Sequence, residues 1–231
     1  MRYTLITLLI LTSFSVLSTE HKTTEKHHED PTKVITKLGV GYTDDLTVSG
    51  SIALDQVRKI NGKTNKDASE WRLGGSWLFD FGIVNFSVGR SEYDDGGKKE
   101  NYSVGTFLPL SALGVYTGKW MIFPMAGINH NKIDRFIEDE PESLDELVMQ
   151  QNTNNGGYLG AMVLRPLSQQ WTAMGFVGGG LGSDDYSNVW GGAGASYKIN
   201  DNHSFNLFGF VADDSYGTTS KVAINYTYEF K

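Results

Sequence analysis

The sequence contains no cysteine and only 5 prolines. Without cysteine, no disulfide can stabilise the fold, and an export signal cannot be of the lipoprotein type, which attaches lipid to a cysteine. Lysine and arginine number 20 against 27 aspartates and glutamates, which gives a formal charge of −7. This shortage of basic residues argues against a nucleic-acid partner, whose phosphates require a basic surface.

Long apolar runs are also missing once the N-terminus has passed. Residues 1–18 have the parts of a secretory signal peptide, with Arg2 as the positive start and an apolar stretch from Leu5 to Leu17. This stretch is short of the ~20 residues of a membrane-spanning helix. We therefore predict export, with cleavage after Ser18.

The next stretch, residues 19–33, is polar and charged, and we predict a mobile N-terminal tail. It contains His21, His27 and His28, but their spacing fixes no metal geometry. We assign no metal to it. Residues 34–231 follow as one domain, without a linker or an internal repeat.

The C-terminal segment Lys221–Lys231 alternates strictly between two kinds of side chain. Successive side chains of a strand point to opposite faces, so this segment predicts a strand with one apolar, aromatic face and one small, polar face. The apolar face carries Val222, Ile224, Tyr226, Tyr228 and Phe230.

The same alternation recurs through the domain, and 27 glycines with 12% aromatic residues suit a protein of strands and turns. It predicts strands at 34–43, 46–59, 69–80, 83–93, 100–108, 113–129, 157–166, 170–182, 187–199, 203–213 and 220–230. A closed bacterial barrel has an even strand number. Either the first two segments do not both span, or 113–129 hides a turn. We predict about ten strands, with eight or twelve as alternatives.

The predicted connections alternate between tight and long. The tight ones are 43–46, 80–82, 167–170 and 200–202, and the long ones are 60–69, 94–100, 129–156 and 182–187. Short periplasmic turns and longer outer loops are typical of membrane barrels. A secreted β-sandwich, the alternative fold, has no reason for this asymmetry.

An export signal and a terminal strand carrying Tyr226, Tyr228 and Phe230 resemble the bacterial outer-membrane β-barrels as a broad class. The resemblance implies an all-β fold, a single antiparallel transmembrane β-barrel in the cell outer membrane. It implies outer-membrane lipid, lipopolysaccharide and the barrel-assembly machinery as partners, with the terminal strand as the assembly signal.

Charged residues on the predicted lumen faces have both signs. Buried charges must be paired or hydrated, so this set either stiffens a filled interior or lines a thin aqueous path. We favour a filled interior, because barrels of eight to ten strands leave little free cross-section. The predicted lumen cluster is Lys37, Asp55, Arg72, Asp80, Arg165, Lys198 and Glu229.

The longest predicted loop, 129–156, is strongly acidic, and Ser143–Glu146 matches a capping box that predicts a short helix over 144–151. The loop is either a solvated surface or a site for a divalent cation or a protein partner. Its acidic residues are Asp134, Glu138, Asp139, Glu140, Glu142, Asp145 and Glu146.

No catalytic constellation or cofactor motif is predicted. Acidic pairs at Asp94–Asp95, Asp184–Asp185 and Asp213–Asp214, with His130, suggest an omptin-like protease as a remote alternative, because paired carboxylates can activate water. The leading prediction is a non-enzymatic outer-membrane barrel with an envelope-structural or narrow-pore role. The other alternative is a receptor or adhesin that acts through loop 129–156.

Overall fold

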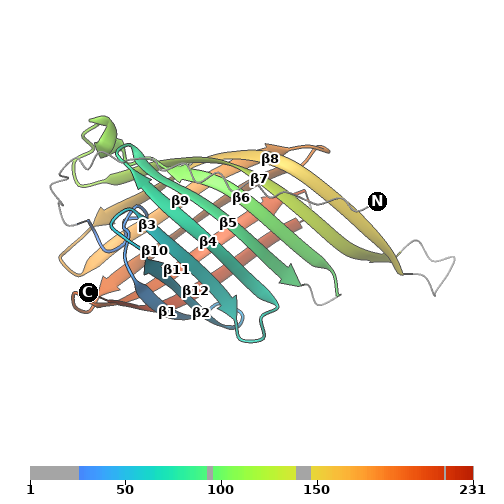
Figure 1. Ribbon diagram of the computed structural model, residues 1–231, viewed down its shortest axis with the longest axis horizontal. Coiled ribbons are helices and arrows are strands. Elements are labelled where there is room, and N and C mark those ends of the chain that lie inside the picture. The colour runs from blue at the N-terminus through green and yellow to red at the C-terminus, as the bar shows by residue number, and fades with distance from the viewer. Residues whose placement is uncertain (1–25, 93–95, 139–146, 216, 231) are drawn as a thin grey trace, which may run out of the picture.

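A computed structural model of the chain describes residues 26–92, 96–138, 147–215 and 217–230. They form an elongated β-barrel whose strands run obliquely to its long axis (Figure 1). The predicted signal peptide lies outside the described residues. The strands are β1 (Lys37–Tyr42), β2 (Leu46–Ala53), β3 (Arg58–Asn65), β4 (Glu70–Phe79), β5 (Gly82–Glu92), β6 (Lys98–Phe107), β7 (Met121–Glu138), β8 (Leu147–Pro166), β9 (Trp171–Gly182), β10 (Ser187–Lys198), β11 (His203–Asp214) and β12 (Gly217–Glu229), with a 3-10 turn η1 (Leu110–Leu113).

Each strand pairs with its sequence neighbours, and β1 closes the barrel on β12. The closing pair is antiparallel, with Lys37 opposite Glu229 and Tyr42 opposite Ile224. The predicted all-β single antiparallel closed barrel is confirmed. Closure leaves no sheet edge along the paired lengths, which a barrel in lipid requires.

The strand number is twelve, not about ten, because the predicted strand 46–59 contains a turn. The Asp55 carboxylate accepts hydrogen bonds from the backbone N–H groups of Val57 (2.9 Å) and Arg58 (2.7 Å) and closes that turn. The strand that follows, β3, was predicted as part of the loop 60–69. Its sequence RKINGKTN is polar enough to look like a connection.

The connections do not divide into short and long as predicted. The end of the barrel where β1 begins and β12 finishes is called the terminal end, and the opposite one the far end. The stretch 108–120, which contains η1, is a long connection at the terminal end. At the far end the long β7–β8 hairpin projects past its neighbours (Figure 1), since β6 pairs with β7 only as far as Asp134.

The two faces of the barrel wall differ in chemistry. The outward face presents large apolar side chains to the surroundings, such as Ile128 (66% exposed), Leu159 (70%) and Leu181 (74%). The inward face carries small and polar residues on most strands. An apolar exterior around a polar interior is the pattern of a barrel that sits in lipid.

The interior is itself divided. On β7, β8 and β9 the inward side chains Phe123, Leu164 and Met174 are buried in one cluster, and Phe208 of β11 packs against it. Phe176 stacks on Phe208 with ring centroids 5.1 Å apart. This part of the wall is filled by its own side chains.

Inward aromatic rings lie flat where the neighbouring strands carry glycine. A Cβ atom at Gly178 would collide with the Trp190 ring, and one at Gly160 would approach it to 2.8 Å. The two glycines are paired across β8 and β9, and Gly178 is paired with Trp190 across β9 and β10. The glycines therefore make the space that this ring occupies.

We predict that Gly178→Val destabilises the barrel by about 1–3 kcal/mol, the usual cost of overpacking. The added side chain must displace Trp190. Urea titration followed by tryptophan fluorescence measures the loss.

Gly175→Ala is the matched control on the same strand, because a Cβ there points outward and meets its nearest atoms at 3.5 Å. Equal destabilisation by the two substitutions would contradict the role assigned to Gly178.

Candidate functional site: the bore and the segment that crosses it

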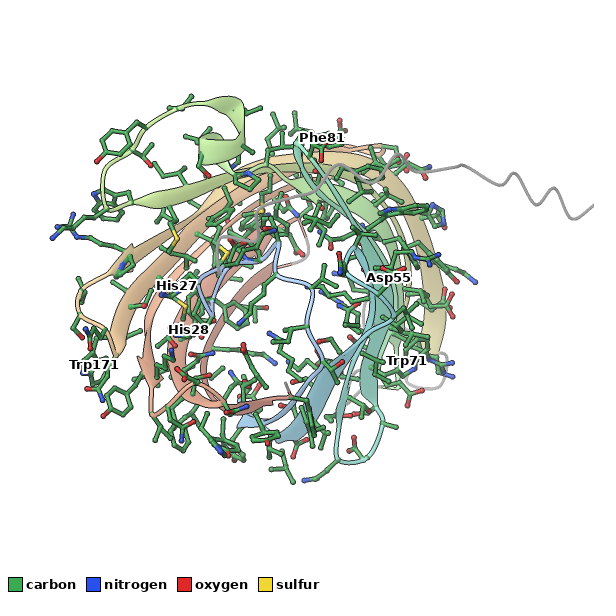
Figure 2. The ribbon with its side chains drawn as sticks, turned by 60° about the vertical axis from the view of Figure 1, so that its left-hand side comes forward. His27, His28, Asp55, Trp71, Phe81 and Trp171 are labelled. Carbon is green, nitrogen blue, oxygen red and sulfur yellow. The ribbon has the colours of Figure 1, made fainter. Side chains whose placement is uncertain are left out.

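Residues 26–36, here called the crossing segment, lie inside the barrel at its terminal end. Figure 2 shows His27 and His28 within the ring of strands, with Trp171 on the outside. The His27 ring lies 3.0 Å from the Thr172 hydroxyl on β9, and the His28 ring lies 3.2 Å from the Ser196 hydroxyl on β10. Both hydroxyls are on the inward face.

The other end of the crossing segment is held by a different part of the wall. The Lys59 ammonium on β3 donates to the Lys33 carbonyl oxygen (2.6 Å), and the Lys33 ammonium forms an ion pair with Glu229 of β12 (2.7 Å). In the closed order of twelve strands, β3 and β9 are six places apart, and so they form opposite walls. The segment therefore spans the bore.

The crossing segment is also braced internally. Asp30 accepts hydrogen bonds from the Thr32 backbone N–H and hydroxyl, each at 2.7 Å. Lys26 donates to the Thr32 carbonyl (3.1 Å), and Thr32 is fully buried. The described part of the predicted mobile tail is thus a docked element, because polar partners on the lumen wall replace the water it would meet outside.

The hydrogen bonds assign the tautomer of His27 and place a proton on Nε2 of His28. The Nδ1 of His27 accepts from the Glu29 backbone N–H (3.1 Å), which leaves its Nε2–H to donate to Thr172. The Ser196 hydroxyl donates to the Glu29 carboxylate (2.8 Å), so the His28 Nε2–H donates to Ser196. The docked geometry thus fits a neutral His27, because a second proton on Nδ1 would remove an acceptor.

Burial acts in the same direction. It lowers the pKa of His27 to about 4, assisted by the neighbouring His28. Burial also lowers the pKa of His28, although Glu29 and Glu229 act against it. The segment is docked most firmly when both rings are neutral.

The bore is open on the side away from the apolar cluster. The inward side chains Asn61 and Lys63 of β3 and Arg72 of β4 are exposed, although they point into the barrel. Exposure of inward side chains means that water reaches them. The bore is therefore filled by side chains along β7–β9 and hydrated along β3 and β4.

The predicted lumen cluster is placed only in part as expected. Lys37, Arg72, Lys198 and Glu229 are on the inward face, at the registers that pair Lys37 with Glu229 and Lys198 with Ser204. They are not gathered at one point. Lys198 forms an ion pair with Asp201 at the rim (2.8 Å).

For the other three members of that cluster, the predicted position in the lumen was wrong. Asp55 lies in the β2–β3 turn, where it forms an ion pair with Arg58 (2.6 Å), and Asp80 lies in the exposed β4–β5 turn. Arg165 points outward, with its guanidinium 4.8 Å from the centre of the Trp120 ring. The prediction failed for Arg165 because its neighbour Leu164 is apolar but faces the filled part of the interior.

The prediction of a long acidic loop over 129–156 was also wrong in part. Much of 129–156 belongs to strands, with Asp134 and Glu138 on β7, and β8 begins at Leu147 where the helix 144–151 was predicted. Strand pairing with β7 outweighs the local helix signal there. The remaining acidic residues, Asp139, Glu140, Glu142, Asp145 and Glu146, lie outside the described residues. The terminal strand has Tyr226 and Tyr228 on β12, with Phe230 directly after it.

The residues of the protease alternative are not brought together. His130 of β7 is on the outward face and hydrogen-bonds Asn155 (2.7 Å), whereas Asp214 of β11 is on the inward face. Asp184 and Asp185 are in the β9–β10 turn at positive φ, and Asp94–Asp95 lies outside the described residues. Within the described ranges, no group of three or more potential metal ligands occurs.

Two sets of interior residues were not predicted. Lys59 and Lys63 were missed with the strand that carries them. Thr172 and Ser196 were missed because a single hydroxyl on a strand carries no signal of what it binds. The alternation of β9 and β10 does place both on the polar face.

The closed barrel with an apolar exterior and a polar, partly hydrated bore is the architecture of the bacterial outer-membrane β-barrels. Among the described residues, no helix is long and apolar enough to cross a membrane. No protein-family model matches the chain, and no curated protein sequence matches it.

Solved structures of this architecture do match. The translocator domain of the autotransporter NalP from Neisseria meningitidis has a TM-score of 0.57 at 14% identity, over 84% of this chain and 85% of that one. The β domain of the Bordetella autotransporter BrkA has a TM-score of 0.54 at 14% identity, over 86% and 100%. The NanC porin has a TM-score of 0.50 at 10% identity, over 85% and 99%. At these identities the likeness establishes the fold alone.

Acid should release the crossing segment from the wall. Because the docked pKa of each histidine is lower than its free value, the stabilisation from neutral rings is complete above about pH 6.5 and is lost as the pH falls toward about 4. A spin label at Lys26→Cys, in a chain with no other cysteine, should gain mobility over this window. Electron paramagnetic resonance measures that change.

The control carries His27→Gln and His28→Gln in addition. Its label mobility should stay constant between pH 7 and 5. A transition that persists in the control would mean that Glu29, Asp30 or Glu229 governs release instead of the histidines.

Proposed function

We propose that this protein is an integral outer-membrane barrel that passes small solutes through a narrow, water-filled bore, which the crossing segment restricts at the terminal end. The observation that carries the proposal is the hydrated side of the bore, with Asn61, Lys63 and Arg72 exposed inside the barrel. A purely structural barrel gains nothing from hydrated lysine and arginine in its interior.

The strand number supports a narrow passage. Side chains fill a barrel of about eight strands, and porins of 16–18 strands enclose an aqueous channel. Twelve strands lie between these cases. Here side chains fill the bore along one part of the wall and leave it open along the other. The open cross-section is therefore smaller than the area that the twelve strands enclose.

The exterior supports a membrane location. Aromatic side chains gather at the terminal end, as in the girdles that mark a membrane interface. Trp77, Phe79 and Phe81 stack in series, with centroids 5.7 and 5.4 Å apart. Trp171 and Tyr197 are 4.8 Å apart. With the terminal end in the periplasm, the crossing segment faces that compartment.

A solved structure of similar fold, the NanC porin, agrees with this proposal in kind. The receptor alternative depends on an acidic loop of which most acidic residues lie outside the described residues. The protease alternative relies on acidic pairs in which, for Asp213 and Asp214 of β11, the two carboxylates point to opposite faces of the wall. Solute passage uses features of the described barrel itself.

Reconstituted in a planar bilayer, the protein should give small, steady conductance steps. Deletion of residues 26–33 should raise the conductance severalfold, because it removes the chain that spans the bore. Single-channel recording in potassium chloride measures both values.

Glu229→Gln is a milder companion to that deletion, since it removes the carboxylate that pairs with Lys33. It should leave the step size unchanged and increase the time spent at the high conductance. Silence of both the intact and the shortened protein, each shown to be folded, would refute the proposed passage.

A charge on the outward face should be costly if that face meets lipid. Val177, in the middle of β9, is 61% exposed on this face. Val177→Lys should destabilise the barrel in bilayers by about 2–4 kcal/mol, the cost of lysine near the membrane midplane. Folding titrations in lipid vesicles measure the loss.

Asn61→Lys is the matched control, because it adds the same charge to the hydrated bore. Its cost should be small. A Val177→Lys barrel as stable as the control would place the outward face in water instead of lipid.

A further inference from the structure

Four basic side chains follow one another along the inward face of β1, β3 and β4. This set, here called the basic wall, consists of Lys37, Lys59, Lys63 and Arg72. Lys63 and Arg72 are directly paired across β3 and β4, in the half of the bore toward the far end. Lys37 and Lys59 lie toward the terminal end, where each begins or nearly begins its strand. The basic wall therefore runs along the length of the bore.

Within the described ranges, no side chain of the basic wall forms an ion pair with a carboxylate, although the charge of Asp30 in the crossing segment acts on Lys59. Among the described residues, Lys37, Lys63 and Arg72 form no ion pair, and Lys59 donates to a backbone carbonyl of the crossing segment. Two further inward lysines form ion pairs near the two rims. Lys198 pairs with Asp201, and Lys221 pairs with Asp44 (2.7 Å).

Inward carboxylates on the strands are few, and they lie away from the basic wall or are already engaged. Glu229 is paired with Lys33. Glu70 is at the far-end start of β4, and Asp214 is at the far-end finish of β11. The chain as a whole has a charge of −7, so a cationic interior is the reverse of its overall balance. Lysine and arginine without carboxylate partners attract anions, and low-dielectric walls strengthen that field.

An apolar, aromatic surface completes the bore. Phe176 lies between Phe208 and Trp190, with ring centroids 5.1 and 5.5 Å away. These rings are only partly buried, so they contribute surface to the bore. Tyr158 of β8 is also on the inward face and is only partly buried.

We infer that the bore selects small organic anions that combine a carboxylate with a flat apolar body. The basic wall holds the carboxylate, and the aromatic surface of β8–β11 accepts the body. A cation is repelled by the first surface, and a fully hydrated inorganic anion gains nothing from the second. This inference rests on the proposed passage function and names its solute class.

The first test is the reversal potential in a potassium chloride gradient, recorded on the full protein. Anion selectivity is expected, with a chloride-to-potassium permeability ratio on the order of ten. Lys63→Gln together with Arg72→Gln should bring the ratio toward unity. Lys132→Gln is the matched control, because Lys132 is on the outward face of β7, and it should keep the ratio of the unaltered protein.

The second test compares probes that share a charge or a shape. Benzoate should block the chloride current at roughly tenfold lower concentration than acetate, since its ring can stack on an aromatic wall. Benzylamine, with the same ring and a positive charge, should not block. The double variant Lys63→Gln, Arg72→Gln should lose the benzoate block.

The outcomes separate this inference from the proposed function. Absence of conductance in the intact and shortened proteins overturns the passage function itself. Conductance that prefers potassium, or a ratio that Lys63→Gln and Arg72→Gln leave unchanged, overturns the basic wall as the selecting element. Equal block by acetate and benzoate overturns the role of the aromatic surface.

Discussion

The hydrogen-bonded ladder between β1 and β12 is the constraint on which the rest of the structure depends. Because it closes the sheet, each residue of every strand is assigned to the inside or the outside by its register alone. A one-residue slip at this seam would turn Tyr226 and Tyr228 into the bore and Glu229 toward the exterior. In the observed register Lys37 lies opposite Glu229, and the Lys33–Glu229 ion pair ties the crossing segment to the same point.

The interior is a compromise between packing and hydration. Along β7–β9 the apolar cluster around Phe123 and Leu164 supplies the buried core that a barrel wall otherwise lacks. Along β3 and β4 the chain keeps polar and charged side chains in contact with water. Glycines such as Gly178 let the rings lie against the packed side, so that filling one half of the bore leaves the other half open.

Much of this fold can be predicted from alternation, and the failures have physical causes. β12 and β4 separate cleanly into two faces, and their inward and outward residues follow. β3 was lost because its outward face carries Arg58 and Thr64 as well as Ile60, which blurs the signal. Arg165 was wrongly predicted to face the lumen. On β8 the inward residues include apolar ones such as Leu164, so the expectation that polar residues point inward fails there. The docking of residues 26–36 depends on contacts of this segment with β3 and β9, which are six places apart in the barrel. No local pattern in the sequence predicts such contacts.

The shortness of β1 has a mechanical consequence. β1 has 6 residues, whereas its partner β12 has 13, and the crossing segment continues directly into it. Tension on the N-terminal side of the chain is therefore borne by the two short ladders of β1, of six residue pairs each, after the contacts inside the bore have yielded. The crossing segment protects the seam from such tension. Its contacts with Thr172, Ser196 and Glu229 must break before any backbone hydrogen bond between β1 and β12 is lost.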